Sequence, residues 1–141
     1  MGITIKSEYA FKILLEIAGC EQTKPVSLAA VLGKIRVPKE FAEKIMVELK
    51  EAGIIHSTRG RKGGYRLTRS ADEITALDVV KAVDNPDKII KCTFDETCCD
   101  NPSTCVIRLM IWEKLREAVE KTLESVTLKD LLENCSEMSR K

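Results

Sequence analysis

Apolar residues recur at helical spacing in three segments of the first half of the chain. The first segment follows Ser7, a residue type that caps helices well, and predicts a helix over residues 7–20. The second follows Ser27 and is short. The third begins at Pro38, which suits the first helical position, and runs up to Gly53, which supplies the helix stop. The residues expected to face the core are Ala10, Ile13, Leu14, Ile17 and Ala18, then Leu28, Val31, Leu32 and Ile35, and then Phe41, Ala42, Ile45, Met46 and Leu49.

A strand-like pattern replaces the helical one after Gly53. Residues 54–59 are rich in β-branched side chains, and residues 65–69 form a second strand-like run. The glycine-rich stretch between them predicts a turn, so the two runs are expected to form a β-hairpin. Three helices followed by a hairpin predict a winged helix-turn-helix domain over residues 1–70.

The rest of the chain is predicted to be helical around one polar loop. Thr75 and Asp78 form a start that resembles a capping box, and Thr127 is expected to cap a short last helix. Between them, residues 104–125 carry apolar side chains over more than one narrow stripe. This pattern favours packing against both its own domain and a second copy of the chain. The predicted fold class is mostly α with a β-hairpin wing (α+β), followed over residues 71–141 by a cluster-binding loop and a long dimerisation helix.

Composition excludes several classes of protein. A length of 141 residues fits one domain or a small domain with an appendage, and 44% hydrophobic residues are enough for a core. No apolar run approaches the length of a membrane span, and residues 1–6 do not resemble an export signal. A cytoplasmic protein without membrane contact is therefore expected. Because the chain has one histidine, His56, and no phosphate-binding glycine loop, it is not expected to be an enzyme.

The charge is divided between the two halves of the chain, which favours a DNA-binding first half. Residues 1–70 carry a net +6 and residues 71–141 a net −5, and five basic residues without an acid lie in the hairpin. In a helix-turn-helix the third helix enters the major groove, where glutamate can accept a hydrogen bond from cytosine and lysine can reach guanine or phosphate. Glu43 taken alone is equally consistent with an ordinary exposed side chain. The candidate DNA contacts are Lys39, Glu40, Glu43 and Lys44 on the third helix and Arg59, Arg61 and Lys62 on the hairpin.

Four of the six cysteines lie within fourteen residues of a polar segment. In a protein that is not exported, such clustering favours a metal or redox site over disulfides. Thiolates suit zinc, iron–sulfur clusters and copper(I), but the Cys-x-x-Cys spacing of zinc ribbons is absent, and the wide spacing favours an iron–sulfur cluster over zinc. Adjacent cysteines point in different directions, so three ligands from the loop and a fourth from elsewhere are expected. The four cysteines are Cys92, Cys98, Cys99 and Cys105.

Three segments together resemble a known family. They are residues 7–10 at the start of the first helix, residues 59–67 in the hairpin, and the cysteine loop running into the helix that contains Trp112. Nearly the whole chain is similar to the IscR, NsrR and RirA family of bacterial winged-helix iron–sulfur regulators. The resemblance implies a homodimer whose long C-terminal helices cross, a pseudo-palindromic operator in double-stranded DNA, and a labile iron–sulfur cluster (2Fe-2S or 4Fe-4S) in each subunit.

The resemblance also implies a set of cluster ligands. Cys92, Cys105 and one of the two central cysteines, with Cys99 favoured, match the ligands in the loop of the family. The fourth ligand stays open. Arg108 stands where one branch of the family has a histidine, and Glu8 stands where another branch uses an acidic residue of the partner subunit. Glu8 is equally consistent with a first-turn acid favoured by the helix dipole. Cys98, the neighbour of Cys99, is a third possibility for the fourth ligand.

Taken together, these observations predict a homodimeric transcriptional regulator whose operator binding is controlled by an iron–sulfur cluster that responds to iron supply, redox state or nitric oxide. Cluster binding is expected to order residues 92–105 beside the dimerisation helix and so to change the spacing of the two DNA-reading helices. Two alternatives remain. One is a zinc-stabilised, constitutive DNA-binding protein, and the other is a regulator whose acidic second half docks a metabolic enzyme.

Overall fold

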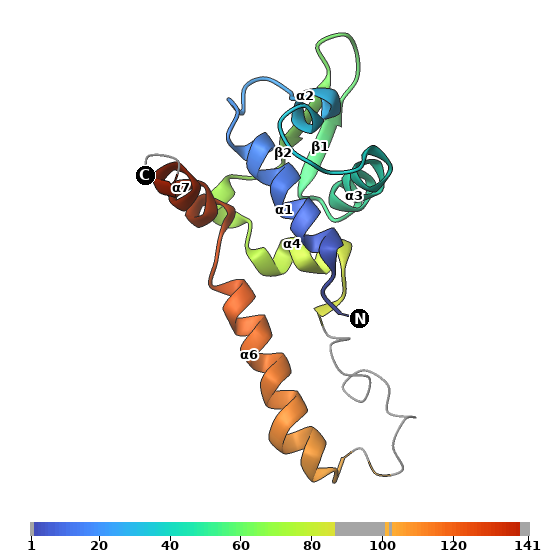
Figure 1. The fold of residues 1–141 in the computed structure, drawn as a ribbon, viewed down its shortest axis with the longest axis vertical. Coiled ribbons are helices and arrows are strands. Elements are labelled where there is room, and N and C mark those ends of the chain that lie inside the picture. The colour runs from blue at the N-terminus through green and yellow to red at the C-terminus, as the bar shows by residue number, and fades with distance from the viewer. Residues whose placement is uncertain (1, 87–100, 102, 139–141) are drawn as a thin grey trace.

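The chain folds into a body of helices and one hairpin, from which a single long helix extends (Figure 1). The structure is a computed structural model that describes residues 2–86, 101 and 103–138. In chain order the elements are α1 (Ile5–Ala18), α2 (Leu28–Leu32), α3 (Lys39–Glu51), β1 (Ile55–Thr58), β2 (Gly64–Leu67), the 3-10 turn η1 (Ala71–Glu73), α4 (Ala76–Val83), the π-helical turn η4 (Arg108–Trp112), α6 (Glu113–Glu124) and α7 (Leu128–Met138).

Helix α1 forms the centre of the body. It begins behind Thr4, whose hydroxyl oxygen accepts a hydrogen bond from the Lys6 N–H at 3.2 Å. The prediction that Ser7 caps this helix is wrong. Ser7 lies inside the first turn, is only 2% exposed, and donates the hydrogen bond of its hydroxyl group to Asp84 at the end of α4. The start of α1 is therefore attached to a residue far along the chain.

The predicted helix-turn-helix is present in α2 and α3. Ser27 caps α2 as predicted, because its hydroxyl oxygen accepts a hydrogen bond from the Ala30 N–H at 3.1 Å. Helix α3 starts directly after Pro38 and ends before Gly53, which adopts a φ of 74°. The prediction that Phe41 faces the core is wrong, because Phe41 lies on the flank of α3 and is 47% exposed. Its ring instead packs in a T-shaped arrangement with the Tyr9 ring, with the ring centroids 5.9 Å apart.

The predicted hairpin is also present and forms the wing, defined here as residues 55–67. Strands β1 and β2 pair in antiparallel register, with Ile55 opposite Leu67 and Thr58 opposite Gly64. The base of the wing is joined to the loop before α2, because Val26 and Tyr65 form an isolated antiparallel bridge. The wing is therefore held against the helix-turn-helix by backbone contacts and not only by the turn that precedes it.

One hydrophobic core takes residues from both sides of residue 70. Helix α4 starts at the predicted capping box, in which the Thr75 hydroxyl oxygen accepts from the Asp78 N–H and the Asp78 carboxylate accepts from the Thr75 N–H. The chain returns to the body at its C-terminal end, where Leu128 is fully buried and its N–H donates to the Ile74 carbonyl oxygen at 2.9 Å. The core residues from this half of the chain are Ile74, Val79, Val83 and Leu128.

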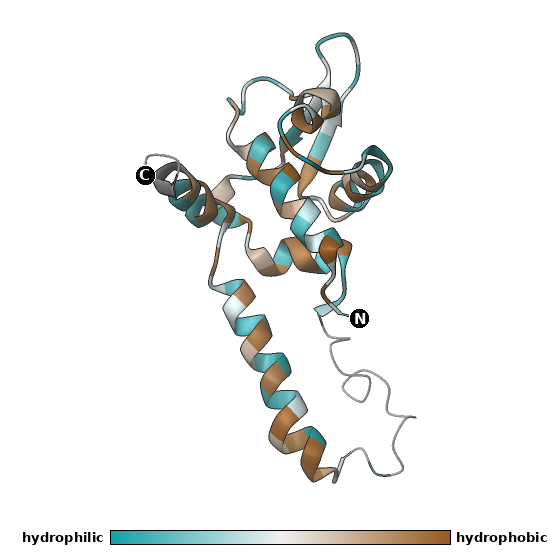
Figure 2. Ribbon diagram, in the orientation of Figure 1, coloured by the Kyte–Doolittle hydropathy of each residue, from teal (hydrophilic) through white to brown (hydrophobic). Residues whose placement is uncertain are grey.

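Helix α6 extends away from the body, as the orange segment of Figure 1 shows. The helix predicted over residues 104–125 is interrupted by the π-helical turn η4 before α6 begins. Hydrophobic residues dominate the end of this segment that lies away from the body (Figure 2). Six large apolar side chains within residues 106–115 are 41–69% exposed: Val106, Ile107, Leu109, Met110, Ile111 and Leu115. Within the described residues, no helix is both long and apolar enough to cross a membrane.

Candidate nucleic-acid interface and metal-ligating residues

The outer face of α3 carries the four side chains that the sequence assigns to DNA. Lys39, Glu40, Glu43 and Lys44 are all exposed, whereas the opposite face of the helix is buried in the core. The Lys39 Nζ atom lies 3.9 Å from Glu43 Oε1, and the two side chains are 76% and 57% exposed. An exposed pair at this distance contributes little to stability, so both groups are available to a ligand.

The same face carries an apolar side chain that the sequence analysis missed. Val47 is 55% exposed and follows Glu43 by one helical turn. Its position was available from the helical spacing, since residues four apart share a face. In the major groove, an apolar side chain can contact the methyl group of thymine.

The wing tip, defined here as Arg59, Arg61 and Lys62, is exposed to solvent. The other two basic residues of the hairpin have structural partners. Arg66 donates from Nη1 to the Gln22 carbonyl oxygen at 3.3 Å, and Arg69 donates from Nη2 to Asp78 Oδ2 at 3.0 Å. The structure therefore separates the five basic residues into three that face outward and two that hold the hairpin in place.

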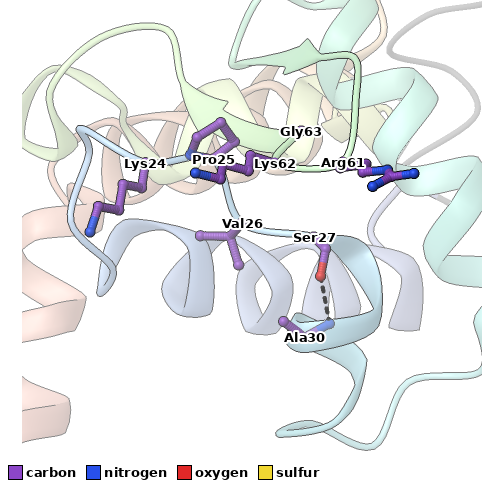
Figure 3. Close-up of a pocket in the computed structure, with 8 residues that line it drawn as sticks. All are labelled: Lys24, Pro25, Val26, Ser27, Ala30, Arg61, Lys62 and Gly63. Atoms are coloured by element: carbon purple, nitrogen blue, oxygen red, sulfur yellow. Dashed lines mark hydrogen bonds between the residues drawn. The ribbon is translucent and has the colours of Figure 1, made fainter.

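A cationic hollow of about 640 Å³ lies between the wing and the loop before α2 (Figure 3). Lys24 and Arg61 lie towards its two ends, and Lys62 lies between them. Phosphate oxygens of a DNA backbone are the anions that such a set of Lys and Arg side chains binds. The sequence analysis missed Lys24, because no spacing rule relates it to a wing residue that follows it by 37 positions. The two are brought together by the Val26–Tyr65 bridge.

The structure describes only some of the predicted metal ligands. Cys92, Cys98 and Cys99 lie outside the described residues, and Cys105 is half-buried just before η4, where its carbonyl oxygen accepts from the Leu109 N–H at 3.0 Å. Glu8 is exposed in the first turn of α1 and pairs with Lys12 Nζ at 2.7 Å. In the part of the chain that the structure describes, no three His, Cys, Asp or Glu side chains gather closely enough to hold a metal ion.

Arg108, which stands where one branch of the resembling family has a histidine, has an ionic partner. Its Nε donates to Glu113 Oε1 at 3.1 Å, and the hydrogen bond from Arg108 holds the pKa of Glu113 below its ordinary value. The pair joins the first residue of η4 to the first residue of α6, so it stabilises the π-helical turn that follows Cys105. Single π-helical turns occur frequently at functional sites.

Comparison with known proteins identifies the architecture. The sequence model of the family described as "Rrf2: Iron-dependent Transcriptional regulator" matches residues 3–134. The chain belongs to the Rrf2 family. It is 32% identical to protein rrf2 of Nitratidesulfovibrio vulgaris over 136 residues, which cover 96% of this chain and 90% of that relative.

Solved structures of Rrf2-family regulators share the fold. The structure of CymR, described as the global cysteine regulator of B. subtilis, matches with a TM-score of 0.77 and 27% identity, covering 95% of this chain and 98% of that one. The IscR of T. potens matches with a TM-score of 0.76 and 25% identity, covering 98% of this chain and 90% of that one. The winged-helix architecture and the family resemblance are confirmed, and the protein is a DNA-binding transcriptional regulator of the Rrf2 family.

Proposed function

We propose that this Rrf2-family protein binds a pseudo-palindromic operator as a homodimer and that an iron–sulfur cluster held by its cysteines controls this binding. The observation that carries the DNA-binding part is the outward orientation of two charged sets, the outer face of α3 and the wing tip, at the end of the body away from α6 (Figure 1). The observation that carries the sensing part is the group of four cysteines in a chain whose family is described as iron-dependent.

The two charged sets have different roles in the proposed complex. Arg61 and Lys62, together with Lys24 across the hollow, contact phosphates and set the position of the domain on the duplex. The α3 side chains reach base edges in the major groove, where Glu43 accepts from a cytosine amino group and Lys44 donates to guanine. Arg59 extends the phosphate contact along the wing. These roles give a salt-dependent affinity from the wing and sequence preference from α3.

A second copy of the chain is the proposed partner of the apolar segment formed by η4 and α6. Exposed apolar side chains on a helix that extends from the body are unfavourable in water and mark an interaction surface. A symmetric pairing of two such helices buries this surface in both subunits and places two wings on one duplex. Half-sites are then separated by one helical turn of DNA, about 34–36 Å, or by a multiple of it.

The donor set fits an iron–sulfur cluster by its chemistry. Cys92, Cys99 and Cys105 supply thiolates, which are soft ligands that suit iron–sulfur clusters, and Glu8 is the proposed fourth ligand from the other subunit. When bound, the cluster would make the protein responsive to iron, oxidants or nitric oxide, because its assembly and oxidation depend on them. Cys105 connects the site to η4 and the dimer helix, and Glu8 connects it to α1, so ligation by both joins the dimer segment of one subunit to the DNA-binding domain of its partner.

Anaerobic purification tests the proposal directly. The full-length protein is expected to be brown, to contain iron and acid-labile sulfide, and to bind its selected operator with different affinities when cluster-loaded and cluster-free at the same salt concentration. Cys92→Ser, Cys99→Ser and Cys105→Ser are each expected to abolish the cluster absorption, whereas Cys135→Ser on α7 serves as the matched control and is expected to retain it. Glu8→Ala tests the fourth ligand by the same spectrum.

Other results would support a different function. Colourless protein that contains zinc and binds DNA without a switch supports a constitutive, zinc-stabilised DNA-binding protein. Protein without iron, sulfide or zinc, even after reconstitution, contradicts the cluster proposal. That result supports control by a partner protein or a small molecule, and capture of a metabolic enzyme without nucleic acid identifies the first of these.

A further inference from the structure

The first turn of α1 makes a dense set of contacts with the end of α4. The Asp84 carboxylate accepts from the Thr4 N–H at 2.9 Å, from the Thr4 hydroxyl at 2.9 Å and from the Ser7 hydroxyl at 2.5 Å. The next residue, Asn85, donates its N–H to the Gly2 carbonyl oxygen at 3.0 Å. We call Thr4, Ser7 and Asp84 the α1–α4 anchor. Ser7 is the only buried polar residue in the described part of the body, whereas Asp84 is half-buried and Thr4 is exposed, so the anchor is buried on its Ser7 side.

The same turn of α1 also holds the recognition helix. Lys6, which directly precedes Ser7, places its Nζ 2.5 Å from Glu48 Oε1 on α3, and the two side chains are only 27% and 32% exposed. The other carboxylate oxygen of Glu48 is buried and has no hydrogen-bond partner among the described residues. Buried polar atoms are nearly always satisfied, so an unsatisfied one calls for an explanation.

An explanation follows from the geometry of the carboxylate. Its two oxygens are equivalent acceptors, and Lys6 occupies one of them in this structure. A small displacement of the first turn of α1 can therefore transfer Lys6 to the second oxygen without losing the ion pair. Elements that have two discrete arrangements convert small shifts at one site into larger changes at another.

We propose that Asp84, Lys6 and Glu48 are positioning residues that couple the end of α4 to the recognition helix α3 through the first turn of α1. Asp84 precedes Cys92 by eight residues, and Glu48 follows Glu43 and Lys44 of the DNA-reading face by about one helical turn. Residues 4–7 form one turn of backbone, so a displacement of Asp84 relative to the body moves Lys6 together with Ser7. This inference rests on the proposed function, because it names the residues that carry the state of the cysteine site to the DNA-binding surface.

A merely structural role predicts a different result from a coupling role. Loss of a stabilising contact weakens the folded protein in every ligation state and leaves the ratio of operator affinities in the loaded and cluster-free forms unchanged. Loss of a coupling contact changes that ratio, because the ratio measures the free energy shared by the two sites. The matched control is Asp78→Asn, which removes a carboxylate of the same chemistry from the other end of α4, where it caps the helix and pairs with Arg69.

The test uses the full-length variants Asp84→Asn, Glu48→Gln and Asp78→Asn. We expect Asp84→Asn and Glu48→Gln to bring the loaded-to-free affinity ratio towards one, a loss within the range of about 5- to 150-fold typical of coupled sites. Asp78→Asn is expected to keep the wild-type ratio. If the wild-type affinity ratio differs from one and both Asp84→Asn and Glu48→Gln retain it, the coupling is overturned, while the cluster-controlled function stands.

Hydrogen exchange of cluster-free protein provides a second, independent reading. If the wild-type ratio is one, the proposed function fails, and the coupling is then judged by exchange alone. Faster exchange of α3 amides in Asp84→Asn than in the wild type and Asp78→Asn supports a mechanical connection between Asp84 and α3. Exchange in α3 that is unaffected by Asp84→Asn overturns it.

Discussion

Val26 and Tyr65 exchange both of their backbone hydrogen bonds, with N–O distances of 2.9 and 2.8 Å, and so fix the base of the wing to the loop before α2. This close approach depends on the glycine beside Tyr65. Gly64 has a φ of +155°, and a Cβ atom there would lie 2.4 Å from the Val26 carbonyl oxygen. This backbone pairing, which a side chain at position 64 would disrupt, therefore contributes to the orientation of the wing relative to the helix-turn-helix, together with the contacts of Arg66 and Arg69.

Gly64→Ala is expected to weaken operator binding by displacing the wing, and to destabilise the protein by on the order of 1–3 kcal/mol through backbone strain. Gly33→Ala is the matched control, because Gly33 has an ordinary helical φ of −68° and the nearest atoms to its added Cβ lie at 3.5 Å. Urea unfolding and gel-shift titration measure the two effects. Wild-type operator affinity in Gly64→Ala would show that DNA binding does not depend on this pairing.

The cationic hollow predicts a change in salt dependence. Lys24→Ala and Arg61→Ala are each expected to reduce the slope of log affinity against log salt by about one, since each removes one phosphate contact, and the double variant by about two. Lys129→Ala on α7 removes an exposed lysine that pairs with Glu133, and serves as the control with an unchanged slope. A slope in Lys24→Ala equal to that of the wild type would place this residue outside the DNA interface.

Local sequence patterns were sufficient for the helices and the wing but not for the contacts between them. The predicted caps at Ser27 and Thr75 are confirmed by their hydrogen bonds. They could be predicted from the sequence because capping involves residues two or three positions apart. Ser7 has the same local character as these residues, yet its hydroxyl donates to Asp84, which is 77 positions away. No local rule distinguishes a serine that caps a helix from a serine that is buried against a distant carboxylate.

The periodic pattern of apolar residues also predicts the helices better than it predicts their packing. A periodic pattern identifies which face of a helix is apolar but not where the core ends, so it places Phe41 in the core, whereas Phe41 is half exposed on the flank of α3. The pattern over residues 104–125 was correct in predicting a helix with excess apolar surface, but spacing alone did not predict the π-helical turn at its start. That turn coincides with the Arg108–Glu113 ion pair, which links residues five apart.

The apolar surface of η4 and α6 predicts a disruption of the dimer by one charge. Ile111 is 50% exposed in the single chain, so Ile111→Glu has little effect on the stability of the subunit. In the proposed dimer the same side chain is buried, and an unpaired carboxylate there is expected to raise the dimer dissociation constant by about a hundredfold or more. Sedimentation velocity over a range of concentrations measures this change.

The control for the dimer prediction is Lys121→Glu, which also makes the segment formed by η4 and α6 more negative, but at an exposed polar position of α6. It is expected to keep the wild-type association state. If Ile111→Glu and the wild type dissociate at the same concentration, the exposed apolar surface of η4 and α6 is not the surface on which two copies meet.

The α1–α4 anchor predicts a specific dependence of stability on pH. Burial raises the pKa of Asp84, but hydrogen bonds from Ser7 and Thr4 together outweigh it and hold the pKa below the ordinary aspartate value of 3.8. A carboxyl group with a lower pKa in the folded state than in the unfolded state stabilises the fold above the unfolded pKa. That contribution is lost as the pH falls through the folded pKa, because the unfolded chain then binds the proton first.

We therefore expect the difference in free energy of unfolding between the wild type and Asp84→Asn to be constant near neutral pH and to shrink as the pH falls from about 5 to about 3. Urea unfolding across this range measures the difference, and the subtraction removes the contributions of the other carboxylates. Ser7→Ala should show a smaller loss with the same direction, because it removes one of the hydrogen bonds that lower the pKa of Asp84. A difference that does not change with pH would mean that the ionised form of Asp84 is not what holds α1 to the end of α4.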